Sequence, residues 1–274
     1  MDGRVLFIGG DKRMQYAAQA VSQHYEVSTL GLFSEEKAPL GRYGAVVLPL
    51  PFSRDGENIN APLSDTALPL SLVRDCAEKG AAVLCGMASQ KLISLCEEES
   101  LRLYDYFTDE ALTLKNAFLT AEAAAALLIQ NTERSLCGAE VLITGGGRIA
   151  MLLAGLLRGF GADVTVCARS SLQRTRAELS FHRTADISEL PRLCGSADII
   201  VNTPPARLFT EQDFAEMRKD AVYTELASLP SEPYESYAMR QGIRYIHAAG
   251  LPGKFSPRTA GEAIAQAVIR RLSE

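Results

Sequence analysis

The sequence lacks the cysteine and histidine patterns of a metal site. Six cysteines are spread along 274 residues without a CxxC pair, and no close Cys/His cluster has the spacing of metal ligands. Most of them stand inside apolar runs, such as Cys85 in "AAVLCG" and Cys167 in "VTVCAR". We therefore expect reduced, buried thiols in a cytosolic protein, and no bound metal.

Long hydrophobic runs and an excess of positive charge are also missing. No apolar stretch reaches the ~20 residues of a membrane-spanning helix. The first residues, "MDGRVLFIGGDKR", lack the basic and apolar regions of a secretory signal. The net charge of −5 argues against a broad nucleic-acid-binding surface. These absences predict a cytoplasmic protein without a membrane or nucleic-acid partner.

What the chain does contain is an alternation of apolar strands and helices. Hydrophobic residues make up 47% of it and charged residues 22%, as in a soluble enzyme of one large or two modest domains. In the first half, "RVLFIGG", "GAVVLPLP" and "AAVLCG" are expected strands. We expect a polar loop over 52–68 and a helix over 68–80. Such alternation predicts a parallel sheet with helices on both faces.

A second series of strands and helices follows a strong helix at 119–136, which is rich in Ala and Leu and which Thr120 could cap. Its expected strands are "EVLIT", "DVTVCA", "ADIIVNTPP", "AVYTELAS" and "RYIHAAG". The amphipathic tail is expected to return and pack on the first domain. We predict one domain from residues 1–118 with the helix 254–274, and another from residues 119–253 that includes the linking helix.

A glycine turn after the strand "EVLIT" fits the pattern G-x-G-x-x-A. The first glycine permits a tight turn, the second lets a pyrophosphate approach the backbone, and the small last residue lets helix and strand pack closely. The helix that follows offers free N–H groups to phosphates. We predict that the turn binds a dinucleotide through Gly145, Gly146, Gly147, Arg148, Ile149 and Ala150.

The next strand ends on an arginine where NAD sites place an acid. Arg169 follows Ala150 by nineteen residues, the distance at which a carboxylate binds the ribose 2′-OH of NAD. A guanidinium binds a 2′-phosphate instead, and Ser170 and Ser171 add further donors. The residues favour NADP, with NAD as the alternative.

These features together predict an α/β fold of two domains. The first is a flavodoxin- or Rossmann-like α/β domain, and the second is an NAD(P)-binding Rossmann domain. Residues at the carboxyl ends of the later strands should face the cofactor crevice. These candidates are Asn202, Thr203, Pro204, Leu226, Ala227, Gly250, Leu251 and Pro252.

Several longer segments resemble one family. They are "LITGGGRIAMLLAGLLRGFGADVTVCARSS", "ADIIVNTPP" and "GLPGKFSPRTAGEAIAQAV", with "FIGGDKR" and "TAEAAAALLIQNT" nearer the start. Together they resemble the family of the dipicolinate synthase A subunit over nearly the whole chain, least between Phe52 and Ala117. One departure is Ala150, where we expect glycine in many relatives, but alanine is still small.

The resemblance implies oxidation of dihydrodipicolinate, formed from 4-hydroxy-tetrahydrodipicolinate of lysine biosynthesis, to dipicolinate, the spore-core chelator. It also implies a substrate-side N-terminal domain and a partner that is a flavoprotein-like B subunit. The implied location is the cytoplasm of the mother cell during sporulation. A homo-oligomer is left open.

The substrate carries two carboxylates, which need cationic or N–H partners. Candidate substrate residues are Arg13, Asn116, Thr120, Arg258 and Thr259. Glu122, expected to open the linking helix, and Asp11, beside the first glycine turn, are candidate catalytic proton acceptors. Aromatisation of the ring drives the loss of the proton, so a strong base is not essential.

Two other hypotheses remain. A shikimate-dehydrogenase-like NADP oxidoreductase shares the "ARS" and "VNTPP" strand ends, although its Lys/Asp pair is not recognisable here. A non-catalytic subunit that binds a cofactor and holds or regulates its partner is the third hypothesis.

Overall fold

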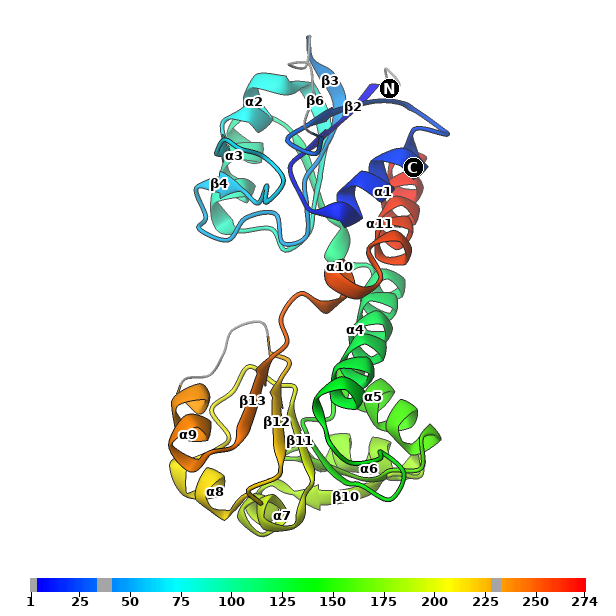
Figure 1. The fold of residues 1–274 in the computed structure, drawn as a ribbon. Helices are drawn as coiled ribbons and strands as arrows, with labels where there is room; N and C mark the ends of the chain where they lie inside the picture. The colour runs from blue at the N-terminus through cyan, green and yellow to red at the C-terminus, as the bar shows by residue number, and fades with distance from the viewer. Residues whose placement is uncertain (1–3, 34–40, 228–232) are drawn as a thin grey trace. The chain divides into compact units, whose positions relative to one another are not determined.

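The computed structural model describes residues 4–33, 41–227 and 233–274 (Figure 1). The chain forms two compact units. Unit 1 comprises Met1–Asn116 and Gly253–Glu274, and unit 2 comprises Ala117–Pro252. The chain leaves unit 1 along helix α4 (Glu110–Asn131) and returns to it along the short helix α10 (Leu251–Phe255).

Unit 1 is built on a five-stranded parallel sheet with the order β2-β1-β3-β6-β7. Renumbered within the unit, this is 2-1-3-4-5, the flavodoxin-like order. The strands are β1 (Arg4–Ile8), β2 (Glu26–Leu30), β3 (Tyr43–Val47), β6 (Ala77–Cys85) and β7 (Arg102–Asp105).

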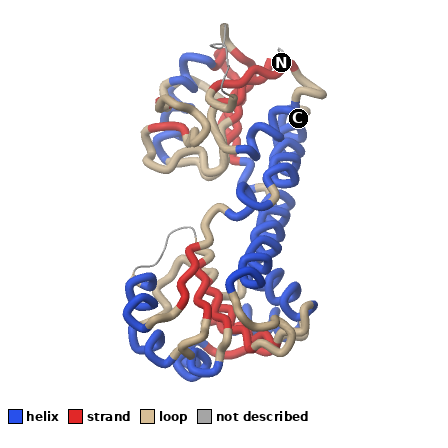
Figure 2. The backbone as a smooth tube through the Cα atoms, viewed as in Figure 1, coloured by secondary structure: helices blue, strands red, loops and turns tan. Residues whose placement is uncertain are grey.

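Helices cover both faces of this sheet (Figure 2). One face packs against α1 (Lys12–Val21) and the C-terminal helix α11 (Pro257–Leu272), and the other against α2 (Leu72–Cys76) and α3 (Gln90–Glu98). The two helices α1 and α11 approach closely at Gly261. A Cβ there would lie 2.3 Å from the carbonyl oxygen of Arg13, so only glycine permits this crossing.

Unit 2 is built on a six-stranded parallel sheet with the order β10-β9-β8-β11-β12-β13. This is 3-2-1-4-5-6, the order of the Rossmann fold. The strands are β8 (Glu140–Thr144), β9 (Asp163–Ala168), β10 (Arg183–Asp186), β11 (Ile199–Asn202), β12 (Val222–Glu225) and β13 (Arg244–His247). The two sheet orders confirm the predicted fold class.

The sheet of unit 2 also lies between two helical layers. The core on one face includes residues of α4, α5 (Arg148–Gly159) and α6 (Ser171–Leu179). The core on the other face includes residues of α7 (Leu190–Ser196), α8 (Glu211–Glu216) and α9 (Tyr234–Gln241). Strands with apolar side chains on both faces, such as β11, fit this double burial.

Three local predictions were wrong. Helix α4 begins at Glu110 rather than 119, because the Asp109 carboxylate accepts hydrogen bonds from the N–H groups of Ala111 and Leu112 and so caps it. Thr120 lies inside this helix and is therefore not its cap. The helix expected over 68–80 is limited to α2, after which β6 begins.

The polar segment 52–68 is not wholly a loop. It holds β4 (Asn58–Ile59), which pairs antiparallel with β5 (Leu68–Pro69). Two 3₁₀ turns, Tyr106–Thr108 and Ile187–Glu189, complete the described elements. Each follows a strand and begins after an aspartate that accepts a backbone hydrogen bond, Asp105 and Asp186.

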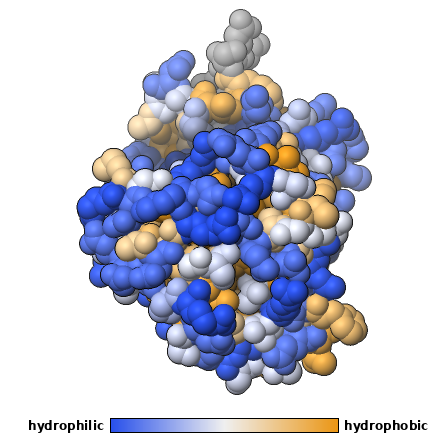
Figure 3. Space-filling model, turned by 60° about the horizontal axis from the view of Figure 1, so that its bottom comes forward, coloured by the Kyte–Doolittle hydropathy of each residue, from blue (hydrophilic) through white to orange (hydrophobic). Residues whose placement is uncertain are grey.

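By length and composition, α4 is the one described helix that could cross a membrane, which the sequence alone had not suggested. Its most apolar window has a mean hydropathy of 1.4, and half of that window is buried inside the protein. A core helix has the same composition. The face of the molecule in Figure 3 is mostly hydrophilic, with small separate hydrophobic areas.

Candidate cofactor site

The sheet of unit 2 has its switch point between β8 and β11, where the strand order reverses. Thr144 and Asn202, the last residues of these strands, are in register. Chains leaving the two strands turn to opposite sides, which opens a crevice at the carboxyl edge where ligands bind in folds of this kind. The glycine turn follows Thr144 directly, so it borders this edge.

Gly145 makes the turn that the sequence predicts. Its φ is +89°, a left-handed conformation that favours glycine, and its N–H donates to the carbonyl of Cys167 at 2.9 Å. A Cβ at this position would lie 2.6 Å from the hydroxyl of Thr203 and 3.1 Å from Cδ of Pro204. The loop after β11 therefore packs directly on the turn.

Gly147 leaves room for a ligand. It is the N-cap residue of α5, with extended backbone (φ −81°, ψ −178°) and no side-chain cap. A Cβ there would meet no described atom within 4 Å. The first N–H groups of a helix have no partner within the helix, and they favour an anion. The turn is therefore a cradle that fits a pyrophosphate.

The rest of the turn supports this cradle. Ala150 is fully buried, so the helix packs closely on the sheet. Ile149 is half-buried and contacts the same core, whereas Arg148 is exposed at the start of α5. Alanine in place of the third glycine is thus compatible with the close helix–strand contact that the pattern requires.

The end of β9 presents Arg169 to solvent. The side chain is exposed and makes no ion pair or hydrogen bond with the residues that the structure describes. Ser170 follows and caps α6, and Ser171 is the exposed first residue of that helix. The start of α6 lies beside the glycine turn, because a Cβ on Gly146 would lie 2.6 Å from Cβ of Gln173.

Arg174, one turn into α6, supports the loop instead of reaching outward. Its guanidinium donates to the carbonyls of Ala168 and Arg169 at 2.7 and 3.0 Å, and it pairs with Asp186 at 2.6 Å. Hydrogen bonds from Ser188, and then the nearby Arg174, hold the pKa of the Asp186 carboxyl below its ordinary value. The hydrogen bonds from Arg174 therefore fix the backbone of the loop that carries Arg169.

The structure places Asn202 differently from its predicted role. Its side chain is fully buried. The amide oxygen accepts a hydrogen bond from the Thr144 hydroxyl at 2.6 Å, and Nδ2 donates to both oxygens of Glu225 at 3.0 and 2.9 Å. The Asn202 amide is thus committed to protein partners, whereas Thr203 and Pro204 remain half-exposed at the rim.

Glu225, the last residue of β12, stands in the strand end "ELAS" that the sequence places toward the crevice, but it was not among the predicted cofactor residues. The side chain has no exposed surface. It accepts hydrogen bonds from Asn202, the Ala227 N–H at 3.0 Å and the Tyr223 hydroxyl at 3.2 Å. Burial raises the pKa of its carboxyl, and these hydrogen bonds oppose the shift. A lone acid at the end of an apolar strand was the available signal.

The remaining predicted cofactor residues lie on the same side of unit 2. Leu226 and Ala227 are buried directly after β12. Gly250 is exposed after β13 with a φ of +68°, a conformation that favours glycine. Leu251 and Pro252 are buried and begin α10.

Unit 1 has a polar cluster at its own switch point, between β1 and β3. Arg13 donates to both carboxylate oxygens of Asp11, through Nε at 2.9 and 3.1 Å and through Nη2 at 2.9 Å. Nη2 also donates to the carbonyl of Leu50 after β3, at 2.6 Å. The Arg13 side chain is 12% exposed. Asp11 is therefore committed to this pair and to capping α1.

The other predicted substrate residues are dispersed. Asn116 and Glu122 lie along α4, and Glu122 is exposed in its middle, not at its start. Arg258 is exposed and pairs with Glu262 at 3.0 Å, one turn along α11. Thr259 is exposed in the first turn of that helix, whose N-cap is Ser256.

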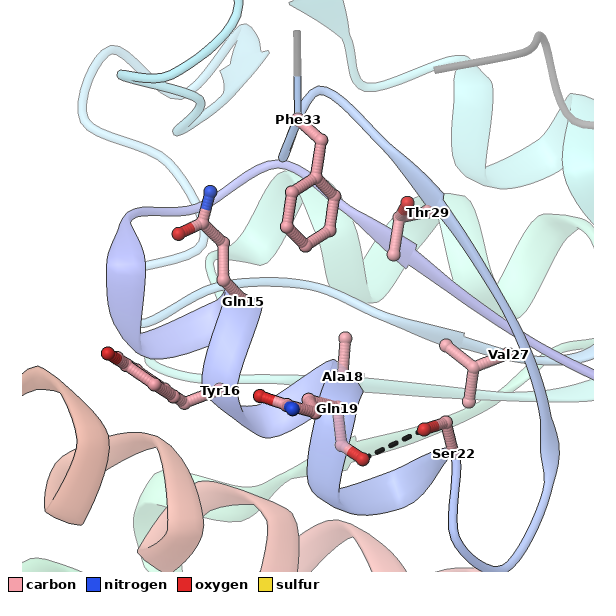
Figure 4. A pocket seen from close by; sticks show the side chains of 8 residues that line it. All are labelled: Gln15, Tyr16, Ala18, Gln19, Ser22, Val27, Thr29 and Phe33. Carbon is pink, nitrogen blue, oxygen red and sulfur yellow. Dashed lines mark hydrogen bonds between the residues drawn. The ribbon is translucent and has the colours of Figure 1, made fainter. Parts of the chain in front are cut away.

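An open groove of about 480 Å³ lies between α1 and β2 of unit 1 (Figure 4). Its described lining, which includes Gln15, Ser22 and Thr29, contains no charged side chain, so it does not suit a dicarboxylate. Within residues 4–33, 41–227 and 233–274, no group of three or more His, Cys, Asp or Glu side chains is placed to hold a metal ion.

Two family models match the chain. One is described as the N-terminal domain of the dipicolinate synthase A subunit, and it matches residues 4–107. The other is described as the NAD-binding domain of D-isomer specific 2-hydroxyacid dehydrogenases, and it matches residues 95–227. The second match contains the glycine turn, Arg169 and the strand ends of β11 and β12.

Similar proteins agree with these matches. The dipicolinate synthase A subunit of Bacillus subtilis (strain 168) is 25% identical over 289 residues, which cover 99% of this chain and 96% of that protein. The crystal structure of the dipicolinate synthase A subunit from Bacillus halodurans is 25% identical, with a TM-score of 0.89 over 100% of this chain and 99% of that one. The crystal structure of the Bacillus subtilis protein has a TM-score of 0.85 at 23% identity, over 100% and 96%.

Proposed function

Because the chain belongs to the family of the dipicolinate synthase A subunit, we propose that it oxidises dihydrodipicolinate to dipicolinate with NADP⁺ as the hydride acceptor. The observation that carries the proposal is the carboxyl edge of unit 2. There an open glycine cradle and a solvent-exposed arginine stand at the ends of neighbouring strands β8 and β9. A pyrophosphate and a 2′-phosphate of one cofactor need such a pair of positions.

The chain is an NAD(P)-dependent oxidoreductase, and unit 2 carries its nicotinamide cofactor. Within that class, NADP is our proposal. Arg169 carries a permanent positive charge, and its side chain forms no ion pair with the described residues, since the nearby Asp186 is paired with Arg174. A carboxylate at this position would repel a 2′-phosphate, whereas a guanidinium binds it with two hydrogen bonds.

The chemistry asks little of the protein beyond orientation. Dihydrodipicolinate loses a hydride and a proton, and the ring becomes aromatic. The bound oxidised cofactor supplies the acceptor for the hydride. The first turn of α5 holds the phosphates. The half-exposed rim residues Thr203 and Pro204 border the crevice. Glu122, an exposed carboxylate, is the proposed proton acceptor.

Arg13 is the proposed ligand of a substrate carboxylate. Its Nε and Nη2 atoms are held by Asp11 and Leu50, so the guanidinium is fixed, while no described residue accepts a hydrogen bond from Nη1. A fixed guanidinium loses little conformational entropy when it binds a carboxylate. Asp11 then orients Arg13 and does not act as the base. Asn116, Thr120, Arg258 and Thr259 are secondary candidates for contacts with substrate.

By the same family relationship, we propose that the partner is a flavoprotein-like B subunit. The location that this relationship supports is the cytoplasm of the sporulating mother cell. The family name of the similar proteins supports the proposal of a partner, since it describes one component of a synthase.

The direct test of the activity is turnover. The purified chain would be mixed with enzymatically generated substrate and NADP⁺, with and without the B subunit, while NADPH absorbance and dipicolinate are measured. We expect both products in at least one mixture. Binding of NADPH with no turnover in either would identify a non-catalytic subunit instead.

Cofactor preference has a separate test in Arg169→Ala. Hydrogen bonds to a charged group contribute about 1.5–3 kcal/mol, so NADPH affinity should fall by about tenfold to a hundredfold. NADH affinity should change by less than about twofold, because NADH has no 2′-phosphate. Arg176→Ala is the matched control, since it removes the same charge from an exposed position of α6. Equal losses of NADPH and NADH affinity would contradict the 2′-phosphate role.

A further inference from the structure

We propose that Glu225 is a positioning residue that holds the loop after β11 against the glycine turn and so shapes the cofactor crevice. The inference rests on the proposed function only in taking the carboxyl edge of unit 2 as the cofactor site. It concerns a side chain that has no exposed surface and that therefore acts through its neighbours.

The last residues of three neighbouring strands form one hydrogen-bonded row. Thr144 of β8, Asn202 of β11 and Glu225 of β12 are in register and bond in sequence across the sheet. Parallel strands in register direct paired side chains to the same face, which lets these side chains meet. The row crosses the switch point, where the cofactor crevice opens.

Asn202 connects this row to the loop that follows β11. Its Nδ2 atom donates to Glu225 and also to the carbonyl of Pro204 at 3.3 Å. The Thr203 hydroxyl donates to the carbonyl of Thr144 at 2.7 Å. Both loop residues that crowd Gly145 are thereby tied to the row, and Glu225 fixes the rotamer of the amide on which one tie depends.

A contribution to stability alone does not explain why a carboxyl is buried at position 225. Burying a carboxyl costs free energy that an apolar side chain would not incur. An apolar residue, however, could not accept hydrogen bonds from Asn202, from the Ala227 N–H and from Tyr223 together. The carboxyl stands at the edge of the sheet where the loop after β11 borders the cofactor crevice.

The test separates positioning from stability with four variants. Glu225→Leu removes the acceptor. Glu225→Gln keeps one oxygen for Asn202 and Ala227 but replaces the other, which lies 2.9 Å from Asn202 Nδ2 and also accepts from Tyr223, by an N–H donor. Thr144→Val removes only the donor to Asn202, in case Glu225→Leu does not fold. Asp213→Ala is the control, because Asp213 is buried and caps α8 with Thr210, outside the row.

The readout is the dissociation constant for NADPH by fluorescence titration, measured well below the Tm of each variant. We expect about tenfold weaker binding in Glu225→Leu and about threefold weaker binding in Thr144→Val and in Glu225→Gln, each of which removes part of the row. Asp213→Ala should lower Tm and leave the dissociation constant unchanged.

Two results would overturn the inference. One is wild-type affinity for NADPH in Glu225→Leu. If Glu225→Leu does not fold, wild-type affinity in Thr144→Val has the same meaning. The other is a Glu225→Gln protein that binds as weakly as Glu225→Leu. Failure of the wild type to bind any nicotinamide cofactor would instead refute the cofactor site itself, so the two failures are distinguishable.

Discussion

Gly147→Ala isolates the contact between backbone and cofactor from the stability of the fold. Gly147 has a φ of −81°, which alanine adopts without strain, and an added Cβ would contact no described atom within 4 Å. In that open space we expect the pyrophosphate to bind. The methyl group should therefore interfere with the ligand and with nothing else in the protein.

The expected stability change is small because two effects oppose each other. Glycine is a better N-cap than alanine by roughly 0.5–1 kcal/mol. Replacing it reduces the conformational entropy of the unfolded chain, which stabilises the folded protein by about 0.4–1 kcal/mol. The free energy of unfolding should therefore change by less than about 0.5 kcal/mol, while NADPH affinity should fall at least about tenfold.

Gly155→Ala is the matched control in the same helix. Gly155 also has no described neighbour within 4 Å of an added Cβ, but it lies in the interior of α5, away from its N-terminus. Alanine there should raise stability by about 0.5–1 kcal/mol and leave binding unchanged. Thermal unfolding and NADPH titration of both variants make the test. A Gly147→Ala protein with wild-type affinity would refute the cradle.

Two further predictions concern buried groups. Among the described residues Cys137 is the one exposed cysteine, and burial raises the pKa of Cys167 to about 11 and of Cys194 to about 12, so a thiol reagent should modify one cysteine rapidly in the native protein and five more only after unfolding. Two rapidly reacting thiols would contradict the described burial. Burial lowers the pKa of His182 below its ordinary 6.5, so the unfolded state binds more protons and the free energy of unfolding should decrease as pH falls through that value. His182→Gln should weaken this pH dependence, and an unchanged dependence would contradict the assignment to His182.

The parts of the fold that the sequence predicted are those with strong periodic patterns. The strands around the glycine turn are apolar and buried on both faces, so they were recognisable. Strand β10 was not predicted, because it is an edge strand with one buried residue, Ala185, and so has no hydrophobic periodicity. The start of α4 was misplaced because the cap at Asp109 was not recognised.

In the candidate site, too, some features could be predicted from the sequence and others could not. Backbone requirements could be derived locally, as the φ of Gly145 and the space at Gly147 illustrate. Side-chain partnerships could not, because they depend on neighbouring strands and on rotamers. Asn202 was expected at the crevice but bonds to Glu225, and Asp11 was expected as a base but holds Arg13. Both partnerships join side chains that the sequence alone does not bring together.

A crystal structure of the protein with NADP⁺ would decide whether the carboxyl edge of unit 2 binds this cofactor. We predict the pyrophosphate on the first turn of α5 beside Gly147 and the 2′-phosphate within hydrogen-bonding distance of the Arg169 guanidinium. An adenosine moiety bound elsewhere, or a 2′-phosphate that points away from Arg169 into solvent, would refute both assignments.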